Sequence, residues 1–145
     1  MKLIFGYWKG KFIVTDQELF NQAVRVIINQ GGPSINRERK QCMYRNSNGR
    51  KCVAGHFIPD EKYSPDMEDQ AIFWGFDSGP DFNNTFEGIF EDLNVKMLGE
   101  FQQIHDSCSH NSDEEFIGEW ISQMTQFGKD NSLNLDVFDE YYLGS

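Results

Sequence analysis

The chain has 145 residues, of which 39% are hydrophobic and 14% aromatic, and its formal net charge is −10. This length suits one domain with one hydrophobic core, and the apolar content excludes a disordered chain. No apolar run approaches the roughly 18 residues of a membrane-spanning helix, and the first residues lack the apolar stretch and cleavage site of a secretory signal. We therefore expect a single domain, residues 1–145, in the cytoplasm.

The first helix has clear start and stop signals. Residues 3–14 are aromatic and β-branched around two glycines, which predicts a short strand or hairpin. Thr15 and Glu18 then have the spacing of a capping box, in which each side chain satisfies a free amide at a helix start. Apolar residues follow at spacings of one, three and four, and Gly31 supplies a stop. We predict a helix from Asp16 to Gln30.

A β-hairpin is predicted from Gln41 to Ile58. Asn48-Gly49 offers the positive φ angles of a two-residue turn, and the segments on both sides have strand character. Pro59 has no amide hydrogen for a ladder bond and ends the second strand. The hairpin carries most of the residues with binding chemistry.

Two further helices are predicted in the second half. One apolar stripe extends from Thr85 to Ser107, and Ser112 with Glu115 forms a second capping box before an apolar pattern that stops at Gly128. Ser64 and Pro65 begin a shorter helical turn. The expected fold is α+β, with three amphipathic helices packed on a small antiparallel sheet or β-hairpin.

Cysteine and histidine residues raise the question of a zinc site. Three cysteines in a chain without an export signal indicate reduced thiols. The spacing lacks the close C-x2-C pairs of a zinc motif, although Cys52 and His56 form a candidate pair. A two-residue turn points Cys42 and Cys52 to opposite faces of the hairpin, whereas a three-residue loop places them on one face. We favour buried free thiols over zinc. The residues of ligand type are Cys42, Cys52, His56, His105, Cys108 and His110.

The charge is unevenly divided along the chain. Residues 1–55 have a balance of +7 and residues 56–145 a balance of −17. A basic cluster with an aromatic ring can hold phosphates or stack a base, which makes the hairpin a candidate nucleotide or nucleic-acid site. The alternative, which we favour, is that these cations pair with the acidic half. The candidate residues are Arg37, Arg39, Lys40, Tyr44, Arg45, Arg50 and Lys51.

Two other sets of residues are candidates for function. His105 and Asp106, with Glu68, form a candidate binding set, and Cys108 with His105 or His110 as base is a catalytic alternative. The surplus of carboxylates can imitate a phosphate backbone toward a basic partner. Acidic residues are concentrated at residues 60–69, 87–92, 113–119 and 136–140.

The segment CMYRNSNGRKCVAGHFIPDEKYSPDMED, with FQQIHD later in the chain, resembles a family of small bacteriophage and bacterial proteins that has no known reaction. The resemblance covers about residues 15–125. His56 departs from the family pattern, which has cysteine there. The matching residues are Lys51, Cys52, Gly55, Ile58, Pro59, Asp60, Tyr63, Glu68, Gln103, His105 and Asp106.

The resemblance implies a phage-encoded accessory protein rather than a particular chemistry. Small phage proteins often bind and disable a host factor, including components of antiviral defence. We therefore expect a non-enzymatic inhibitor in the host cytoplasm that acts by protein–protein contact. One alternative is a metal-dependent enzyme centred on Cys52, His56, Glu68, His105 and Asp106, and another is a nucleotide or nucleic-acid binder at the basic hairpin.

Overall fold

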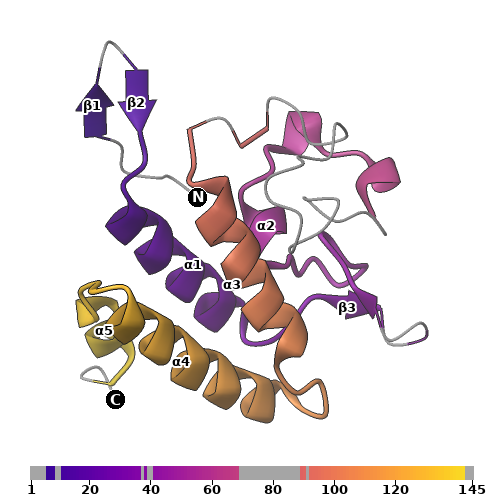
Figure 1. Cartoon of the computed structure of the whole chain (residues 1–145). Helices are drawn as coiled ribbons and strands as arrows, with labels where there is room; N and C mark the ends of the chain where they lie inside the picture. Colours follow the sequence, from indigo (N-terminus) through magenta and orange to yellow (C-terminus); the bar gives the residue numbers. More distant parts are fainter. Residues whose placement is uncertain are drawn as a thin grey trace.

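Three long helices form the framework of the protein. The computed structural model describes residues 6–8, 11–36, 38, 41–68, 89–90 and 92–142. The long helices are α1 (Asp16–Gln30), α3 (Val95–Ser107) and α4 (Asp113–Asp130), and all three contact one another. Figure 1 shows α3 lying over α1, with α4 beneath them and short α2 beside α3. The expected α+β fold is therefore wrong, because the protein is mainly helical and its helices pack on one another.

Strands are confined to two short antiparallel ladders among the described residues. The first pairs β1 (Gly6–Trp8) with β2 (Lys11–Ile13), which confirms the hairpin expected near the start of the chain. The second pairs β3 (Ile35–Asn36) with β4 (Gln41–Cys42). Ladders of two or three residues bury too little surface to serve as a sheet for helix packing.

Helix α1 has the predicted bounds and the predicted cap. Thr15 Oγ1 accepts from the amide of Glu18 at 3.1 Å, and the Glu18 carboxylate accepts from the amide of Thr15 at 3.4 Å. At the other end Gly31 adopts φ 87°, the left-handed conformation that glycine allows without steric cost. Both termini were therefore readable from local sequence.

Helix α3 is shorter than predicted. It begins at Val95, where the Asn94 side chain accepts from the amide of Met97 at 3.1 Å. Residues 89–90 and 92–93 form turns and bends, and residues 85–88 lie outside the described residues. Phe90 lies in a turn and is buried, so it continues the apolar pattern upstream of the helix. For this reason, periodicity alone predicted a helix that is too long.

Helix α4 starts as predicted but extends past Gly128 to Asp130. Ser112 Oγ accepts from the amide of Glu115 at 3.1 Å. Gly128 is buried, and a Cβ there would collide with Leu135 and would meet the ring of Phe20 at 3.1 Å. This glycine therefore permits close packing and is not a stop signal.

The predicted hairpin from Gln41 to Ile58 is wrong in its register and in its second strand. Arg45 pairs with Lys51 across the loop Ser47-Asn48-Gly49, so the loop has three residues and not two. Gly49 has φ 83° as its last residue, which is the geometry of a three-residue hairpin loop with a glycine bulge.

After Lys51 the chain turns into helix α2 (Val53–His56), with Cys52 as its N-cap. Gly55 lies against the backbone carbonyl of Tyr44, where any side chain would collide. Small residues thus let this turn of helix approach the hairpin, and the strand-like composition misled the prediction.

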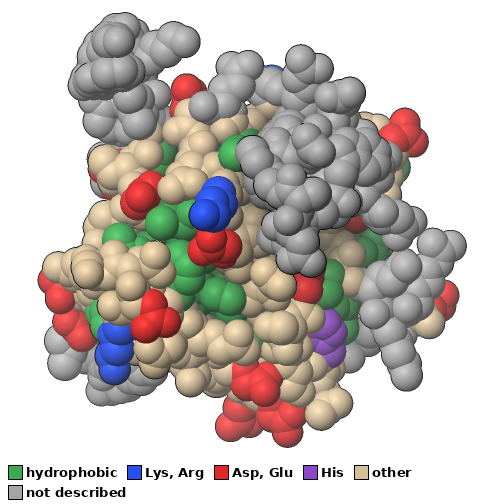
Figure 2. Space-filling model, viewed as in Figure 1, with side chains coloured by type: hydrophobic (Ala, Val, Ile, Leu, Met, Phe, Trp, Pro, Cys, Tyr) green, Lys and Arg blue, Asp and Glu red, His purple; other side chains and the backbone are tan. Residues whose placement is uncertain are grey.

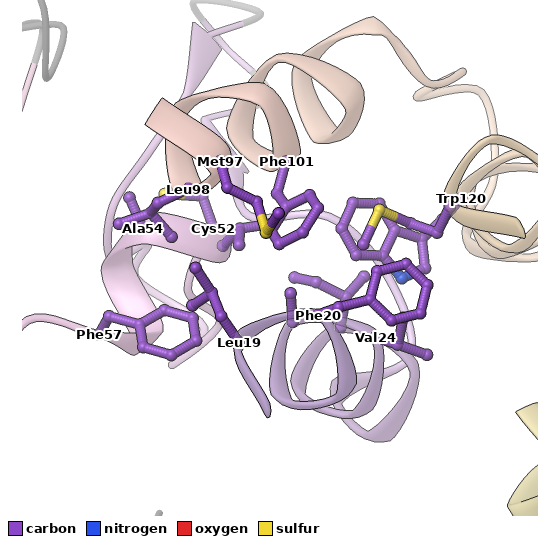
Figure 3. Close-up of a cluster of buried hydrophobic side chains, with 14 of the residues drawn as sticks. Leu19, Phe20, Val24, Cys52, Ala54, Phe57, Met97, Leu98, Phe101 and Trp120 are labelled. Carbon is purple, nitrogen blue, oxygen red and sulfur yellow. The ribbon is translucent and has the colours of Figure 1, made fainter. Parts of the chain in front are cut away.

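The core lies between α1, α2, α3 and α4. Figure 3 shows Phe20 of α1, Phe57 at the end of α2, Phe101 of α3 and Trp120 of α4 pointing toward a common centre. The ring of Phe20 contacts that of Phe101 edge-on with centroids 6.1 Å apart. Aromatic side chains of this size supply most of the buried apolar area in a small domain.

Short helices complete the fold. Ser64 caps η2 (Pro65–Met67) as predicted, and η1 (Asp60–Lys62) precedes it. The chain ends in η4 (Asp136–Phe138) and α5 (Asp139–Tyr142), where η4 contacts α1 and its Val137 and Phe138 are buried. Across the described part of the chain, none of the helices has the length and apolar character needed to cross a membrane.

Candidate functional site

The predicted basic cluster is only partly visible in the structure. Arg37, Arg39 and Lys40 lie outside the described residues. Tyr44 is buried at 8% exposure, so its ring is not presented as a platform for a nucleic-acid base. The remaining members, Arg45, Arg50 and Lys51, all contact acceptors within the chain.

Arg45 is held by three groups of the segment that follows α2. Its guanidinium donates to the carbonyl of Ile58 at 2.9 Å, pairs with Asp60 at 2.8 Å and lies over the ring of Tyr63 at 4.4 Å from the centroid. Lys51 Nζ also lies 3.9 Å from Asp60 Oδ1. Arg45 and Lys51 therefore both contact a carboxylate of the protein itself, that of Asp60.

Arg50 joins the hairpin loop to the start of α4. Its two terminal nitrogens donate to the two oxygens of Asp113, each at 2.9 Å, which is the bidentate geometry that suits arginine and carboxylate. The hydrogen bond to Asp113 raises the pKa of Arg50. Asp113 thus has two roles at the start of α4: it binds Arg50, and its negative charge is favourable at a helix N-terminus.

Glu68 binds the hairpin backbone. Its carboxylate oxygens accept from the amides of Tyr44 at 2.9 Å and Arg45 at 3.1 Å, and from the Tyr63 hydroxyl at 2.7 Å. Burial and this hydrogen bond raise the pKa of Tyr63 to about 12, so the phenol stays protonated and donates. Glu68 is therefore a structural acceptor that fixes the hairpin to the loop after α2.

Cys52 and His56, the candidate zinc pair, contact different partners. Cys52 Sγ accepts from the amide of Gly55 at 3.4 Å as the cap of α2, and burial raises the pKa of its thiol. His56 Nε2 lies 2.9 Å from Oε1 of Gln30. Burial, followed by the nearby Lys51 charge, lowers the pKa of His56 to about 4.

Gln30 is a connector that sequence reasoning missed. Its side-chain oxygen accepts from the amide of Lys51 at 3.0 Å as well as from His56. Its side-chain nitrogen donates to the carbonyls of Lys51 at 2.7 Å and Gly32 at 2.9 Å. Its place as the last residue of α1 was the only sequence signal, and a helix-terminal glutamine rarely indicates such a role.

A second group of reactive side chains meets at the end of α3. One potential ligand atom each of Cys42, His105 and Asp106 lie within 4.8 Å of one another. Cys42 Sγ is also 4.0 Å from Nε2 of His110, in the loop before α4. Burial and the neighbouring Asp106 carboxylate raise the pKa of Cys42 well above its ordinary value. These ligand-type residues are far apart in the sequence. They converge although the hairpin loop has three residues and α3 is shorter than predicted.

The catalytic alternative with Cys108 as nucleophile finds little physical support. Cys108 Sγ accepts from the side-chain nitrogen of Gln123 at 3.6 Å, and burial, with Glu119 nearby, raises the pKa of its thiol to about 12. A nucleophilic cysteine needs the opposite shift, because the thiolate is the reactive form.

An open groove of about 380 Å³ lies beside the hairpin loop, lined by residues 35–36, 38, 43 and 46–48. Its lining is mostly amide and apolar, and Glu38 is the charged residue among the lining residues that the structure describes. A carboxylate repels a phosphate, so the described part of the lining adds no support for the nucleotide alternative.

The exposed face of α4 is acidic at its start. Glu114, Glu115 and Glu119 are exposed, and Figure 2 shows acidic side chains gathered where Figure 1 places the beginning of this helix. Glu115 and Glu119 accept from the hydroxyl and amide of Ser109, respectively. Gly118 lies among them, and a Cβ added there would meet nothing within 4 Å.

Comparison of the chain with protein-family models, with curated proteins and with solved structures finds no match. The function is therefore argued from the geometry of the chain itself.

Proposed function

We propose that this protein is a phage-encoded accessory protein that binds a basic surface of a host protein through the exposed face of α4 and thereby inhibits it. Its place of action is the host cytoplasm, and components of antiphage defence are the class of target. The observation that supports this proposal is that the acidic face of α4 has an exposed glycine, Gly118, at its centre.

Internal ion pairing supports the acidic face as the binding surface. Arg45 and Lys51 contact Asp60, Arg50 contacts Asp113, and Arg25 contacts Glu140 at 2.8 Å. These pairs join cations of the first 55 residues to acids of the rest, yet the later segment holds a surplus of seventeen negative charges. Negative charge that the chain does not neutralise steers association with a basic partner.

Gly118 has no evident structural reason to be glycine. It lies inside α4, it is exposed, and space around its Cβ position is open. A glycine in an exposed helix interior lowers stability by about 1 kcal/mol relative to alanine. A surface without a side chain at this point allows a partner backbone to approach the helix closely.

We expect Gly118→Ala to stabilise the free protein by about 0.5–1 kcal/mol, because alanine is the better helix former and meets open space. Urea unfolding followed by circular dichroism measures this change. The matched variant Gly128→Ala should instead destabilise the protein, since its Cβ would collide with Leu135. A loss of stability in Gly118→Ala would show that the glycine has a structural role.

The binding proposal is tested with two charge reversals that change the net charge equally. Glu114→Lys alters the α4 face and spares the two glutamates that hold Ser109, whereas Glu61→Lys alters an exposed site on η1. Immobilised protein is incubated with lysate of a susceptible bacterium at low and at high salt. We expect a captured protein whose yield drops in Glu114→Lys and Gly118→Ala, persists in Glu61→Lys and decreases with salt. Equal capture by the two charge reversals would contradict the proposal.

A further inference from the structure

Three residues of metal-ligand type lie around Cys42 at the end of α3: His105 and Asp106 have ligand atoms within 4.8 Å of its sulfur, and His110 Nε2 lies 4.0 Å from it. Cys42 lies on β4, His105 and Asp106 lie in the last turn of α3, and His110 lies in the loop before α4. We propose that Cys42, Asp106 and His110 bind a divalent cation of the zinc class. We call this set, with His105 as its support, the α3-end site.

The distance between the ligand atoms of Cys42 and His110 is close to the one that zinc requires. Zinc–sulfur bonds of about 2.3 Å and zinc–nitrogen bonds of about 2.0 Å at a tetrahedral angle separate the ligand atoms by about 3.5 Å. Cys42 Sγ and His110 Nε2 are 4.0 Å apart, and His110 would have to rotate its half-buried side chain to reach a cation held by Cys42 and Asp106. The carboxylate of Asp106 lies within 4.8 Å of the same sulfur.

The donor set also selects the kind of metal. A thiolate and an imidazole match the borderline softness of zinc, whereas calcium and magnesium prefer oxygen ligands alone. Binding releases the thiol proton of Cys42 to solvent, as metal binding to cysteine requires. The thiolate and the Asp106 carboxylate then balance the charge of the cation, and three protein ligands leave one position for water.

Asp106 is already oriented for this role. Its Oδ1 lies 2.9 Å from Nδ1 of His105 and accepts from the side chain of Gln102 at 2.8 Å. These two contacts fix the position of the carboxylate beside Cys42. Such outer hydrogen bonds orient ligands in metal sites and affect affinity by about 10- to 100-fold.

His105 acts as the positioning residue and not as a ligand. The amide of Ser34 donates to its Nε2 at 3.4 Å, so Nε2 is an acceptor and Nδ1 is the ring nitrogen that donates to Asp106. A metal on Nδ1 would move the ring proton to Nε2, against the Ser34 amide. The ring is fully buried and contacts Phe116 edge-on at 5.2 Å, which holds this orientation.

The test uses untagged full-length protein, reduced and freed of metal by a chelator. Zinc is titrated in competition with a coloured chelator, and cobalt is used as a spectroscopic probe of the same site. We expect a single high-affinity zinc ion per chain and, with cobalt, the charge-transfer absorption of a thiolate–metal bond. Absence of that absorption would overturn the proposal.

Three variants assign the ligands. We expect Cys42→Ser to abolish the thiolate–cobalt absorption, and His110→Ala to weaken zinc binding at least about tenfold. His110 lies in a loop, so we expect His110→Ala to leave the circular dichroism spectrum unchanged. This variant therefore keeps the test valid if Cys42→Ser unfolds. The matched control His56→Ala should retain zinc binding. Wild-type affinity in His110→Ala, or an equal loss in His56→Ala, would overturn the ligand set.

Discussion

Replacing Glu68 with alanine should lower the free energy of unfolding by about 3–4 kcal/mol, the largest loss that we expect from a single polar side chain here. The substitution removes the acceptor of two backbone amides, those of Tyr44 and Arg45, and of the Tyr63 hydroxyl. Each donor left without a partner away from water costs about 1–3 kcal/mol. Urea unfolding at neutral pH measures the effect.

Two variants separate this cause from a general effect of charge. Tyr63→Phe removes one of the three donors and keeps the carboxylate, so we expect a loss of about 1 kcal/mol. Glu61→Ala removes an exposed acidic residue of the same segment and should change stability by less than about 0.5 kcal/mol. If Glu68→Ala resembles Glu61→Ala, the carboxylate does not hold the hairpin as we argue.

The helix termini were predictable where a side chain caps the backbone locally. Thr15 with Glu18 and Ser112 before Glu115 marked two helix starts correctly, because these bonds connect residues three positions apart. Asn94 is a cap of the same kind, but the apolar stripe on both sides of it concealed the boundary. Periodicity reports burial, and a turn buries Phe90 as effectively as a helix would.

The segment from Lys51 to Ile58 shows where local reasoning fails. Its β-branched and aromatic residues favour a strand, yet the chain forms α2 because Gly55 can lie against the Tyr44 backbone. That contact depends on the tertiary arrangement and has no signature in the segment. The Asn48-Gly49 pair correctly marked a turn, but Gly49 also fits the last position of a three-residue loop, and this shifts the register by one residue.

The candidate sites were predictable by residue type but not by partner. The charge pattern favours pairing of Arg45, Arg50 and Lys51 with the acidic half, and Asp60 and Asp113 are the partners that they contact. A bidentate contact between residues 63 positions apart follows from the packing of α4 against α1 and α3. The same packing brings Cys42 beside His105 and Asp106, whereas sequence proximity had suggested Cys52 with His56.

Lowering the pH from about 6.5 to about 4 should remove up to about 3 kcal/mol of stability through His56 alone. The ordinary pKa of histidine is 6.5, and burial beside Lys51 lowers that of His56 to about 4 in the folded protein. Between these values the unfolded chain binds a proton that the folded protein excludes. The contribution is therefore fully present above pH 6.5 and is lost as the pH falls toward 4.

The neutral imidazole is favoured because the ring is largely buried and its Nε2 hydrogen bonds to Gln30 Oε1 at 2.9 Å. His56→Gln offers an amide donor to the same oxygen and does not titrate. Urea unfolding of the two proteins at pH 7, 6, 5 and 4 gives their difference in stability at each pH, in which the titration of all other groups cancels. We expect the free energy of unfolding of the wild type to fall steadily, relative to that of His56→Gln, below pH 6.5. Parallel curves would show that His56 takes up its proton equally well in the folded and unfolded chain, which its burial at the end of α2 against Gln30 argues against.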